Sequence, residues 1–529
     1  MRLVVLLILS LLAFTPAQAA GPEPYDAEAM LARIYAGEVG TVEAHYAWMQ
    51  AQFLAGEIDA DAVRRAYMIF DTTHPDTIAF VEDWRAAYPA SPHALAARAW
   101  VKTAAGQIMR GSKRVRETYP QAMEEQHWLH AAALDSALAA LEIEPRLIAA
   151  SDAVLVLANV TGTRHSALGL LDRVMAQDPN WGSLWRGLVA TSKQWGGSTA
   201  LGEDLCLRHG EKLPKGGTDG VKYCLASLYY YVAPDRRAAV PGLLAELDDP
   251  GLDWIRRGMA MSTRDVSPQD AKMLRAYFEG EEARDLDGVR TYDRYTASRY
   301  GFEPQEQAVA ARAKAHARTW LRHSPYAPGL IGTLLQKVPR PLDTTGASRR
   351  YTMEDGLEDD ERMQLLWDRL VFAPYEPDHW QDIATEIWSA ASGPDEQVAL
   401  FLAADPMMIN AIAYSNHHPK HLANYVSRKL SQYVQLVYHA EAGWPEPFDR
   451  LAPVLEDDAQ LLCPMLRAAW IYDEVAPRHR NRGYSLSEET VAQVQALRSE
   501  VTAAGRCSDT LRPGAGVYFE PVGAARRGS

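Results

Sequence analysis

Apolar residues recur at steps of three and four along most of the chain. A clear case lies at residues 491–504, where the apolar positions are Val491, Val494, Leu497 and Val501. This spacing puts them on one face of a helix. Ser485 and Glu488 match a capping box before the helix, and Gly505 suits its C-terminal turn. Alternating strand-like runs are scarce. The pattern predicts an all-α protein.

A repeat organised around prolines refines this prediction. In tetratricopeptide (TPR) repeats, two helices occupy 34 residues, and small or apolar residues stand at fixed steps before a helix-ending proline. Pro145 and Pro179 are one such period apart. We therefore count back twelve, eight and five residues from each proline. Before Pro145 these positions are Ala133, Ala137 and Ala140, and before Pro179 they are Ala167, Leu171 and Val174. Before Pro325 they are Ala313, Ala317 and Trp320. The same count fails at Pro406. We expect TPR-like helical hairpins in a degenerate α-solenoid.

Changes in composition suggest where domains begin and end. Residues 20–215 are expected to form an N-terminal TPR-like domain, and residues 216–336 to continue its repeats. Residues 337–351 contain the turn-forming residues Pro339, Pro341 and Gly346 and are expected to form a linker. Residues 352–512 then form a C-terminal helical domain. Residues 513–529 are expected to be a flexible tail.

The first nineteen residues are typical of a cleavable signal peptide. Arg2 precedes an apolar run from Leu3 to Phe14, and Ala17-Gln18-Ala19 offers small residues for cleavage near Ala19/Ala20. The run is too short to span a bilayer, and no later apolar run is long enough. We therefore expect a periplasmic or secreted protein without membrane insertion after signal removal.

Overall charge and composition exclude some partners. The chain is 47% hydrophobic and 23% charged, as expected of a folded protein, and its net charge is −14. A nucleic-acid-binding surface needs a clustered basic face. We therefore expect no nucleic-acid partner.

Four cysteines allow two disulfides in an oxidising compartment. Cys206 and Cys224 lie at equal distances from the turn-rich centre at Lys215, so an antiparallel helix pair brings them together. The pair Cys463–Cys507 follows by elimination. Buried free thiols are the alternative.

Three short patches between residues 80 and 206 carry a family resemblance. They are Trp84 with Tyr88-Pro89-Ala90-Ser91-Pro92, then Ala97-Arg98-Ala99-Trp100 with Arg110-Gly111, and finally Trp195-Gly196-Gly197-Ser198. In these patches the chain resembles the bacterial domain of unknown function numbered 4034. The resemblance implies a TPR-like helical module in exported or regulatory proteins, and it supplies no catalytic residues.

The Trp195-Gly196-Gly197-Ser198 patch has two interpretations. Trp195 is a candidate binding residue if the glycine turn exposes its ring to a peptide or sugar. The structural interpretation ends a helix at Trp195, gives the glycines positive φ, and uses Ser198 to cap the next helix. The pattern favours the structural interpretation.

Histidines cluster once, in Asn416-His417-His418-Pro419-Lys420-His421. Pro419 suits the first position of a helix, which leaves His417 and His418 just before it. No His-Glu-x-x-His or Cys-x-x-Cys motif accompanies them. We expect a solvated helix start and no metal, and retain His417 and His418 as candidate binding residues.

An acidic run and a tyrosine group each allow a structural and a functional interpretation. The acidic run Glu354–Glu361 lacks calcium-loop spacing, so its acids are expected to favour a helix N-terminus. Tyr229, Tyr230 and Tyr231, with Tyr223, form the densest aromatic group. They suit either core packing or a ligand surface.

Catalytic and cofactor signatures are missing from the sequence. No Gly-x-Ser-x-Gly, Walker or Gly-x-Gly-x-x-Gly motif occurs. We therefore expect an extracytoplasmic scaffold that binds a protein or peptide, without cofactor or catalytic residues. The alternative is an all-α carbohydrate-active or other hydrolase with an acidic pair in a Trp/Tyr-lined cleft.

Overall fold

The computed structural model describes residues 25–262 apart from 112–114, 215–216 and 248, short runs between 272 and 335, most of 338–507, and Phe519. The described chain is helical except for one antiparallel two-stranded ladder. It divides into two compact units, residues 1–105 with 129–327, and residues 106–128 with 328–529. The prediction of an all-α protein is confirmed. The predicted signal peptide lies outside the described residues.

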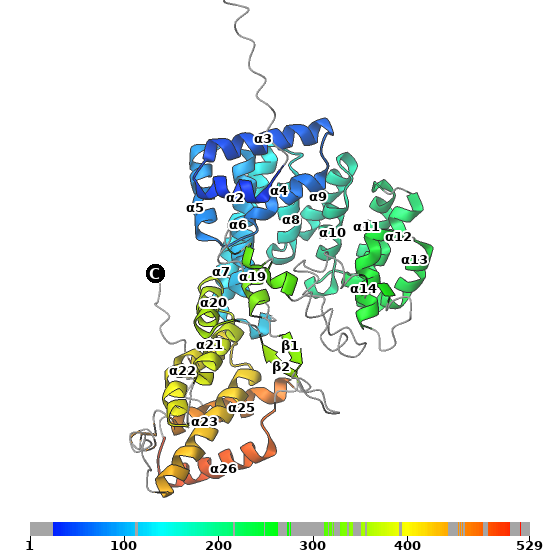
Figure 1. The fold of residues 1–529 in the computed structure, drawn as a ribbon. Coiled ribbons are helices and arrows are strands. Elements are labelled where there is room, and N and C mark those ends of the chain that lie inside the picture. Colours follow the sequence, from blue (N-terminus) through cyan, green and yellow to red (C-terminus); the bar gives the residue numbers. More distant parts are fainter. Residues whose placement is uncertain are drawn as a thin grey trace, which may run out of the picture. The chain divides into compact units, whose positions relative to one another are not determined.

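The first unit contains a long succession of helices (Figure 1). They are α2 (Ala27–Tyr35), α3 (Val39–Ala55), α4 (Ala60–Tyr67), η1 (Met68–Phe70), α5 (Pro75–Ala87), most of α6 (Pro92–Arg110) and α7 (Pro120–Ile143), α8 (Ile148–Thr161), α9 (Arg164–Gln177), α10 (Trp181–Ala190), η3 (Lys193–Trp195), α11 (Thr199–His209), η4 (Gly210–Lys212), α12 (Gly217–Ser227), the π-helical turn η5 (Leu228–Val232), η6 (Pro234–Ala239), α13 (Val240–Glu246), η7 (Pro250–Leu252) and α14 (Asp253–Ser262). Helix α8 packs against both α9 and α10.

The second unit is also built from consecutive helices. They are η2 (Val115–Glu117), α19 (Pro328–Leu334), α20 (Asp359–Phe372), α21 (Pro377–Ser389), α22 (Pro394–Tyr414), α23 (Pro419–Glu441), α25 (Leu462–Val475), η10 (Ala476–His479) and α26 (Glu488–Ala503). Strands β1 (Val338–Pro341) and β2 (Tyr351–Glu354) pair so that Val338 lies opposite Glu354. The segment expected to be a linker, 337–351, thus supplies β1 and begins β2, while residues 342–350 lie outside the described part.

The prolines used to find the repeats do follow helix ends. Helix α7 ends two residues before Pro145, and α9 ends two residues before Pro179. Pro406, where the count failed, lies inside α22. The described small or apolar positions of the count are buried: Ala133, Ala137, Ala140, Ala167, Leu171, Val174, Ala313 and Ala317. Pro325 and Trp320 lie outside the described residues.

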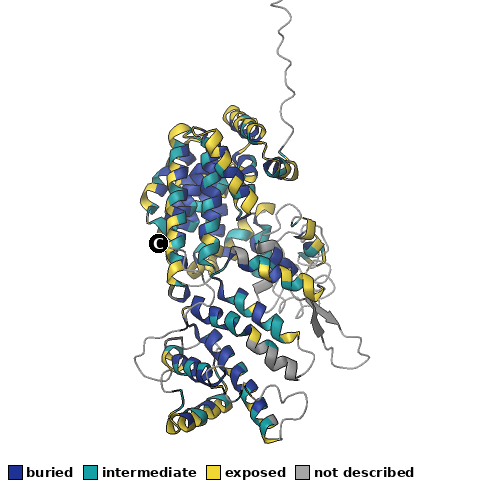
Figure 2. Cartoon of the chain, turned by 90° about the vertical axis from the view of Figure 1, so that its left-hand side faces the viewer, coloured by how far each residue is buried: buried dark blue, intermediate teal, exposed yellow. Residues whose placement is uncertain are grey.

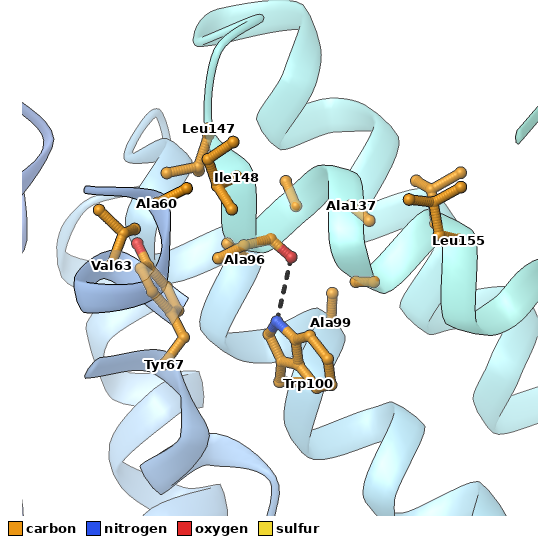
Figure 3. Packing of buried hydrophobic residues seen from close by; sticks show 14 of the residues in the cluster. Ala60, Val63, Tyr67, Ala96, Ala99, Trp100, Ala137, Leu147, Ile148 and Leu155 are labelled. Carbon is orange, nitrogen blue, oxygen red and sulfur yellow. Dashed lines mark hydrogen bonds between the residues drawn. The ribbon is translucent and has the colours of Figure 1, made fainter. Parts of the chain in front are cut away.

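Small residues on neighbouring helices explain the close packing of the first unit. Ala96 and Ala99 on α6 and Ala137 on α7 are fully buried, which lets the helices approach closely (Figure 3). Trp100 fills the space beside them, and its Nε1 donates a 3.0 Å hydrogen bond to the Ala149 carbonyl. Figure 2 shows the result, with helices that are buried on one side and exposed on the other.

The first of the resemblance patches, which contains Trp84 and Ser91, holds helices of the first unit together. Trp84 is fully buried, and its Nε1 donates a 2.6 Å hydrogen bond to Glu43. The Ser91 hydroxyl also donates to Glu43, at 2.7 Å, and accepts from the backbone N–H groups of His93 and Ala94 at the start of α6. These hydrogen bonds to Glu43 connect α3 with α5 and with the start of α6.

The segment 106–128 belongs to the second unit because of its aromatic and polar contacts there. The Tyr119 ring lies 5.8 Å from that of Tyr375 and 5.2 Å from that of Tyr414. The Tyr375 hydroxyl donates a 2.8 Å hydrogen bond to Glu125. The sequence did not suggest this partition, since α6 and α7 each read as one continuous helix.

Helix α26 differs from the expected helix in its start. It begins at Glu488, and the capping side chain is Ser487, which accepts from the Thr490 N–H at 3.1 Å. The predicted capping box was two residues too early. Gly505 has φ +68°, as expected for a helix C-terminus. The acidic run was interpreted correctly: Asp359, Asp360 and Glu361 occupy the first turn of α20.

Both predicted disulfides are present. Cys206–Cys224 joins α11 to α12 with 5.4 Å between the Cα atoms, and Cys463–Cys507 has a Cα separation of 5.5 Å. The tail prediction is wrong at Phe519, whose side chain is buried in the core of the second unit. The rest of 513–529 lies outside the described residues.

Replacing Cys206 and Cys224 together with Ala should destabilise the first unit by about 3 kcal/mol. The disulfide closes a loop of 18 residues, and its loss restores conformational entropy to the unfolded chain. Urea unfolding of the double variant, compared with the untreated and the fully reduced parent, measures the effect. A variant as stable as the oxidised parent would contradict it.

Candidate functional site

Helix α10 has one face that neighbouring helices leave partly open. Its open positions, half-buried rather than buried, are Trp181, Gly182, Trp185, Arg186 and Val189. They recur at steps of one and three or four, as expected for a single face of a helix. Ser183, Leu184, Gly187 and Leu188 lie on the buried side. Asn180 caps the helix by accepting from the Ser183 N–H at 2.8 Å, which sets where this face begins.

Aromatic rings from three separate segments, α10, η5 and α14, gather beside this face. The Trp185 ring lies 5.7 Å from Trp181, 5.4 Å from Tyr231 and 6.2 Å from Trp254. The Tyr230 and Trp254 rings meet edge to face at 5.5 Å. We call Trp181, Trp185, Tyr230, Tyr231 and Trp254 the aromatic surface. Tyr231 is 65% exposed, so this surface includes a large ring open to solvent.

A buried layer holds the aromatic surface in place. The Trp181 ring meets Tyr223 edge to face at 4.8 Å. Tyr223 belongs to a buried cluster with Ala226, Val240, Leu252 and Ile255 from α12, α13, η7 and α14. Trp181, Tyr230 and Trp254 pack on this cluster, so these three rings lose little conformational entropy on binding.

Hydroxyl groups in this region stay neutral at physiological pH. Burial raises the pKa of Tyr223 to about 12, with nearby Asp249 and Asp61 adding to the effect. Burial also raises the pKa of Tyr229 to about 12, and its hydroxyl donates a 2.8 Å hydrogen bond to Glu203. Tyr223 and Tyr229 therefore stay uncharged.

A buried carboxylate lies beside the same face of α10. Asp152 on α8 is fully buried, and its Oδ2 lies 2.7 Å from Arg64 Nε and 3.5 Å from an Arg186 nitrogen. Its Oδ1 accepts a 2.8 Å hydrogen bond from Ser183. Arg64 passes over Gly182, where a Cβ would collide with its guanidinium. Glycine is thus needed at position 182 for this ion-pair network.

The candidate binding residues from the tyrosine group have different environments. Tyr230 and Tyr231 belong to the aromatic surface, whereas Tyr229 faces Glu203 and is half-buried. Arg237 covers the Tyr230 ring at 5.2 Å from its centroid. The π-helical turn Leu228–Val232 explains the split, because its wider winding directs neighbouring side chains away from α-helical positions.

Trp195 has the local geometry of the structural interpretation. It ends η3, Gly196 follows with φ +76°, and Ser198 caps α11 by accepting from the Leu201 N–H at 3.2 Å. The positive φ predicted for Gly197 is wrong. This glycine is instead needed because a Cβ would collide with the Thr191 carbonyl. Arg164 donates to the carbonyl oxygens of Trp195 and Gly196 and holds the turn.

The histidine segment begins a helix, as expected, but it is not solvated. His417 and His418 are each 8% exposed and His421 is 1% exposed. The His417 Nε2 accepts a 2.9 Å hydrogen bond from the Phe519 N–H, and the His418 Nδ1 accepts from Lys420 N–H at 3.2 Å. Phe519 contacts His417 from about a hundred residues later in the chain, which sequence spacing does not reveal. His421 instead lies against Gln381 of α21.

Potential metal ligands converge once in the described part of the chain. Ligand atoms of Asp458, Cys463 and Cys507 lie within 4.8 Å of one another. The two sulfurs form a disulfide, so they offer no thiolate to a metal.

Sequence reasoning missed Trp181, Trp254 and Arg186 as site residues. The spacing of Trp181, Trp185 and Val189 already marks one helix face, and this signal could have found the α10 part. Trp254 is brought to the site by the fold alone.

Within the described residues, no helix has the length and apolar character needed to cross a membrane.

Comparison of the chain with family models and with curated proteins finds no match. The resemblance of residues 80–206 to the domain of unknown function therefore stays a prediction.

Proposed function

We propose that the protein is an extracytoplasmic scaffold of stacked, TPR-like helix pairs that binds a protein or peptide through its aromatic surface. The observation that carries the proposal is the exposed Tyr231 ring, which packs against Trp185. Trp185 in turn lies against Trp181 and Trp254, and these two rings pack on the buried Tyr223 cluster. Rigid aromatic side chains are preferred in interfaces because they bury much area at low entropic cost.

The order of helices supports a solenoid. The rings of the aromatic surface come from α10, from the turn η5 that directly follows α12, and from α14. Helices α10, α12 and α14 are every second α-helix in this part of the chain. In repeats of helix pairs, the first helices of successive pairs line one common surface. The helix-ending prolines and the buried alanines fit the same scheme.

Two disulfides support a location outside the cytoplasm, since such bonds persist mainly in oxidising compartments. The predicted signal peptide agrees with that location.

Tyr231→Ala should weaken binding to peptides that the parent chain selects. We expect at least a tenfold loss, because the variant removes an exposed interface ring without opening the core. The experiment selects peptides from a random 12-residue display library on residues 20–529 and measures their affinity by fluorescence anisotropy.

Tyr438→Ala is the matched control, because Tyr438 is 66% exposed on α23 of the other unit. It should bind the selected peptides as the parent does. Failure to select any peptide, or equal losses in both variants, would reject the proposed surface.

The rival function is a hydrolase with two carboxylates in one cleft. Burial raises the pKa of Asp71 in the first unit and of Asp382 in the second. Such acids suit general acid catalysis. They lie in different units, so no observation joins them into one acid pair, and the scaffold is the better-supported proposal.

A further inference from the structure

Phe519 returns from the C-terminal end of the sequence to the core of the second unit. Its side chain is 7% exposed and belongs to a buried cluster that includes residues of α22, α23 and α25. Its N–H donates a 2.9 Å hydrogen bond to the Nε2 of His417, which lies 102 positions earlier in the chain. Phe519 is therefore held by its side chain and by its backbone.

Three side chains from three different segments hold this residue. The Phe519 ring meets the Tyr425 ring edge to face, with 5.8 Å between their centroids. The Arg467 guanidinium lies over the Phe519 ring, 4.9 Å from its centroid. We call His417, Tyr425 and Arg467 the Phe519 site. An edge-to-face partner and a cation over the ring both favour an aromatic side chain over an aliphatic one.

The groups of the Phe519 site are fixed before a ring enters it. Tyr425 is fully buried, and its hydroxyl donates a 3.4 Å hydrogen bond to Asp405. Burial and the charge of Arg467 lower the pKa of His417 to about 4. The imidazole is therefore neutral near pH 7, and its Nε2 is able to accept a backbone N–H.

The backbone at the Phe519 site is strained. Asn416 has φ +50° and His417 has φ +60°, a left-handed conformation that is uncommon for residues other than glycine. Such strained residues cluster at ligand clamps and switch regions. Glycine would adopt this backbone freely, but it would offer the Phe519 N–H no acceptor. The strained position thus carries the side chain that binds Phe519.

The contacts of Phe519 are those that a separate peptide can also make. They consist of one aromatic ring and the N–H of the same residue, and all of them are reversible. The Cys463–Cys507 disulfide fastens the chain to α25, the helix of Arg467, shortly before Phe519. A short tether gives a high effective concentration, so the chain's own Phe519 outcompetes dilute peptides.

We propose that the Phe519 site is a second peptide-binding site that recognises an aromatic anchor residue, and that the chain's own C-terminal segment fills it until such a peptide displaces Phe519. The site lies in the second unit and is independent of the aromatic surface. The C-terminal segment is thus an autoinhibitory ligand of this site.

The test uses a fluorescent peptide that copies residues 515–523, and measures its affinity for residues 20–529 by anisotropy. Phe519→Ala should bind this peptide at least tenfold more tightly than the parent, because the parent's tethered segment competes for the site. Phe519→Leu should bind it with intermediate affinity, since leucine fills the space without an aromatic ring. Near-ultraviolet circular dichroism checks that both variants fold, and Phe519→Leu alone decides if only that variant folds.

Controls separate the Phe519 site from other contacts. A peptide with alanine in place of Phe519 should bind the Phe519→Ala variant at least tenfold more weakly. Adding His417→Asn to that variant should weaken binding of the original peptide about fivefold, because the backbone acceptor is lost. Adding Tyr231→Ala instead should leave the affinity unchanged, because Tyr231 belongs to the first unit.

Three results would overturn the inference. The two peptides could bind equally well, or the folded variants could bind the original peptide no more tightly than the parent does. Loss of the native spectrum in both variants would show that Phe519 is needed to build the core. Each of these results leaves the scaffold proposal standing, since that proposal is tested on Tyr231.

Discussion

Asp152→Asn should destabilise the first unit by about 3–5 kcal/mol, the usual cost of removing one partner from a buried ion pair. Asp152 is fully buried and accepts from Ser183 while lying against Arg64 and Arg186. Asparagine keeps the shape but leaves two neighbouring guanidinium groups without their shared anion. Hydrogen exchange of the α8 and α10 amides, resolved by mass spectrometry, measures the loss in this unit alone.

Asp61→Asn is the matched control for that experiment. Asp61 pairs with the same Arg64, but its side chain is 53% exposed. Solvent-exposed pairs contribute at most about 1 kcal/mol, so this variant should lose far less protection. Comparable losses for the two aspartates would show that burial does not set the strength of the network, and would contradict the prediction.

This network also shows why the site needs the fold. Asp152 reads as an ordinary helical residue, and Arg64 precedes it by 88 positions. Their pairing depends on α4 packing against α8, which no local pattern specifies. Lys429 is a similar case. It is wholly buried on α23 and pairs with Asp405 at 2.9 Å, although helical lysines are usually exposed.

Local features were predictable from the sequence because their causes are local. The Cys206–Cys224 pair follows from a short helical hairpin, and the helix ends before Pro145 and Pro179 follow from proline's missing N–H. Ser198 caps α11 because its side chain accepts a hydrogen bond from the Leu201 N–H, only three residues later. Each of these depends on residues close in the chain.

Features that need distant segments were missed or mistaken. His417 was expected to be solvated because it stands just before the helix that begins at Pro419. In the structure it is covered by Phe519, about a hundred residues later, whose ring lies 5.8 Å from Tyr425. The aromatic surface likewise needs Trp254 from α14. Long-range packing overrides local polarity in both places.

The second unit should lose stability as the pH falls because of His417. Burial, together with the charge of Arg467, lowers the pKa of His417 from 6.5 to about 4, while the bond from the Phe519 N–H opposes this. Between these values the unfolded chain binds a proton that the folded chain does not. Stability is therefore full above pH 6.5 and falls toward pH 4 and below, with a limiting loss of about 3 kcal/mol.

His417→Asn separates this effect from other acid titrations. Asparagine adopts the left-handed backbone found at His417, where φ is +60°, and does not titrate. Near pH 7 the variant should be somewhat less stable, because Nε2 no longer accepts from Phe519. As the pH falls from 7 to 4, the parent should lose about 3 kcal/mol more than the variant. Hydrogen exchange of α23 and α25, corrected for intrinsic rates, measures both profiles. Parallel profiles would show that burial and the charge of Arg467 do not keep the His417 imidazole neutral in the folded chain.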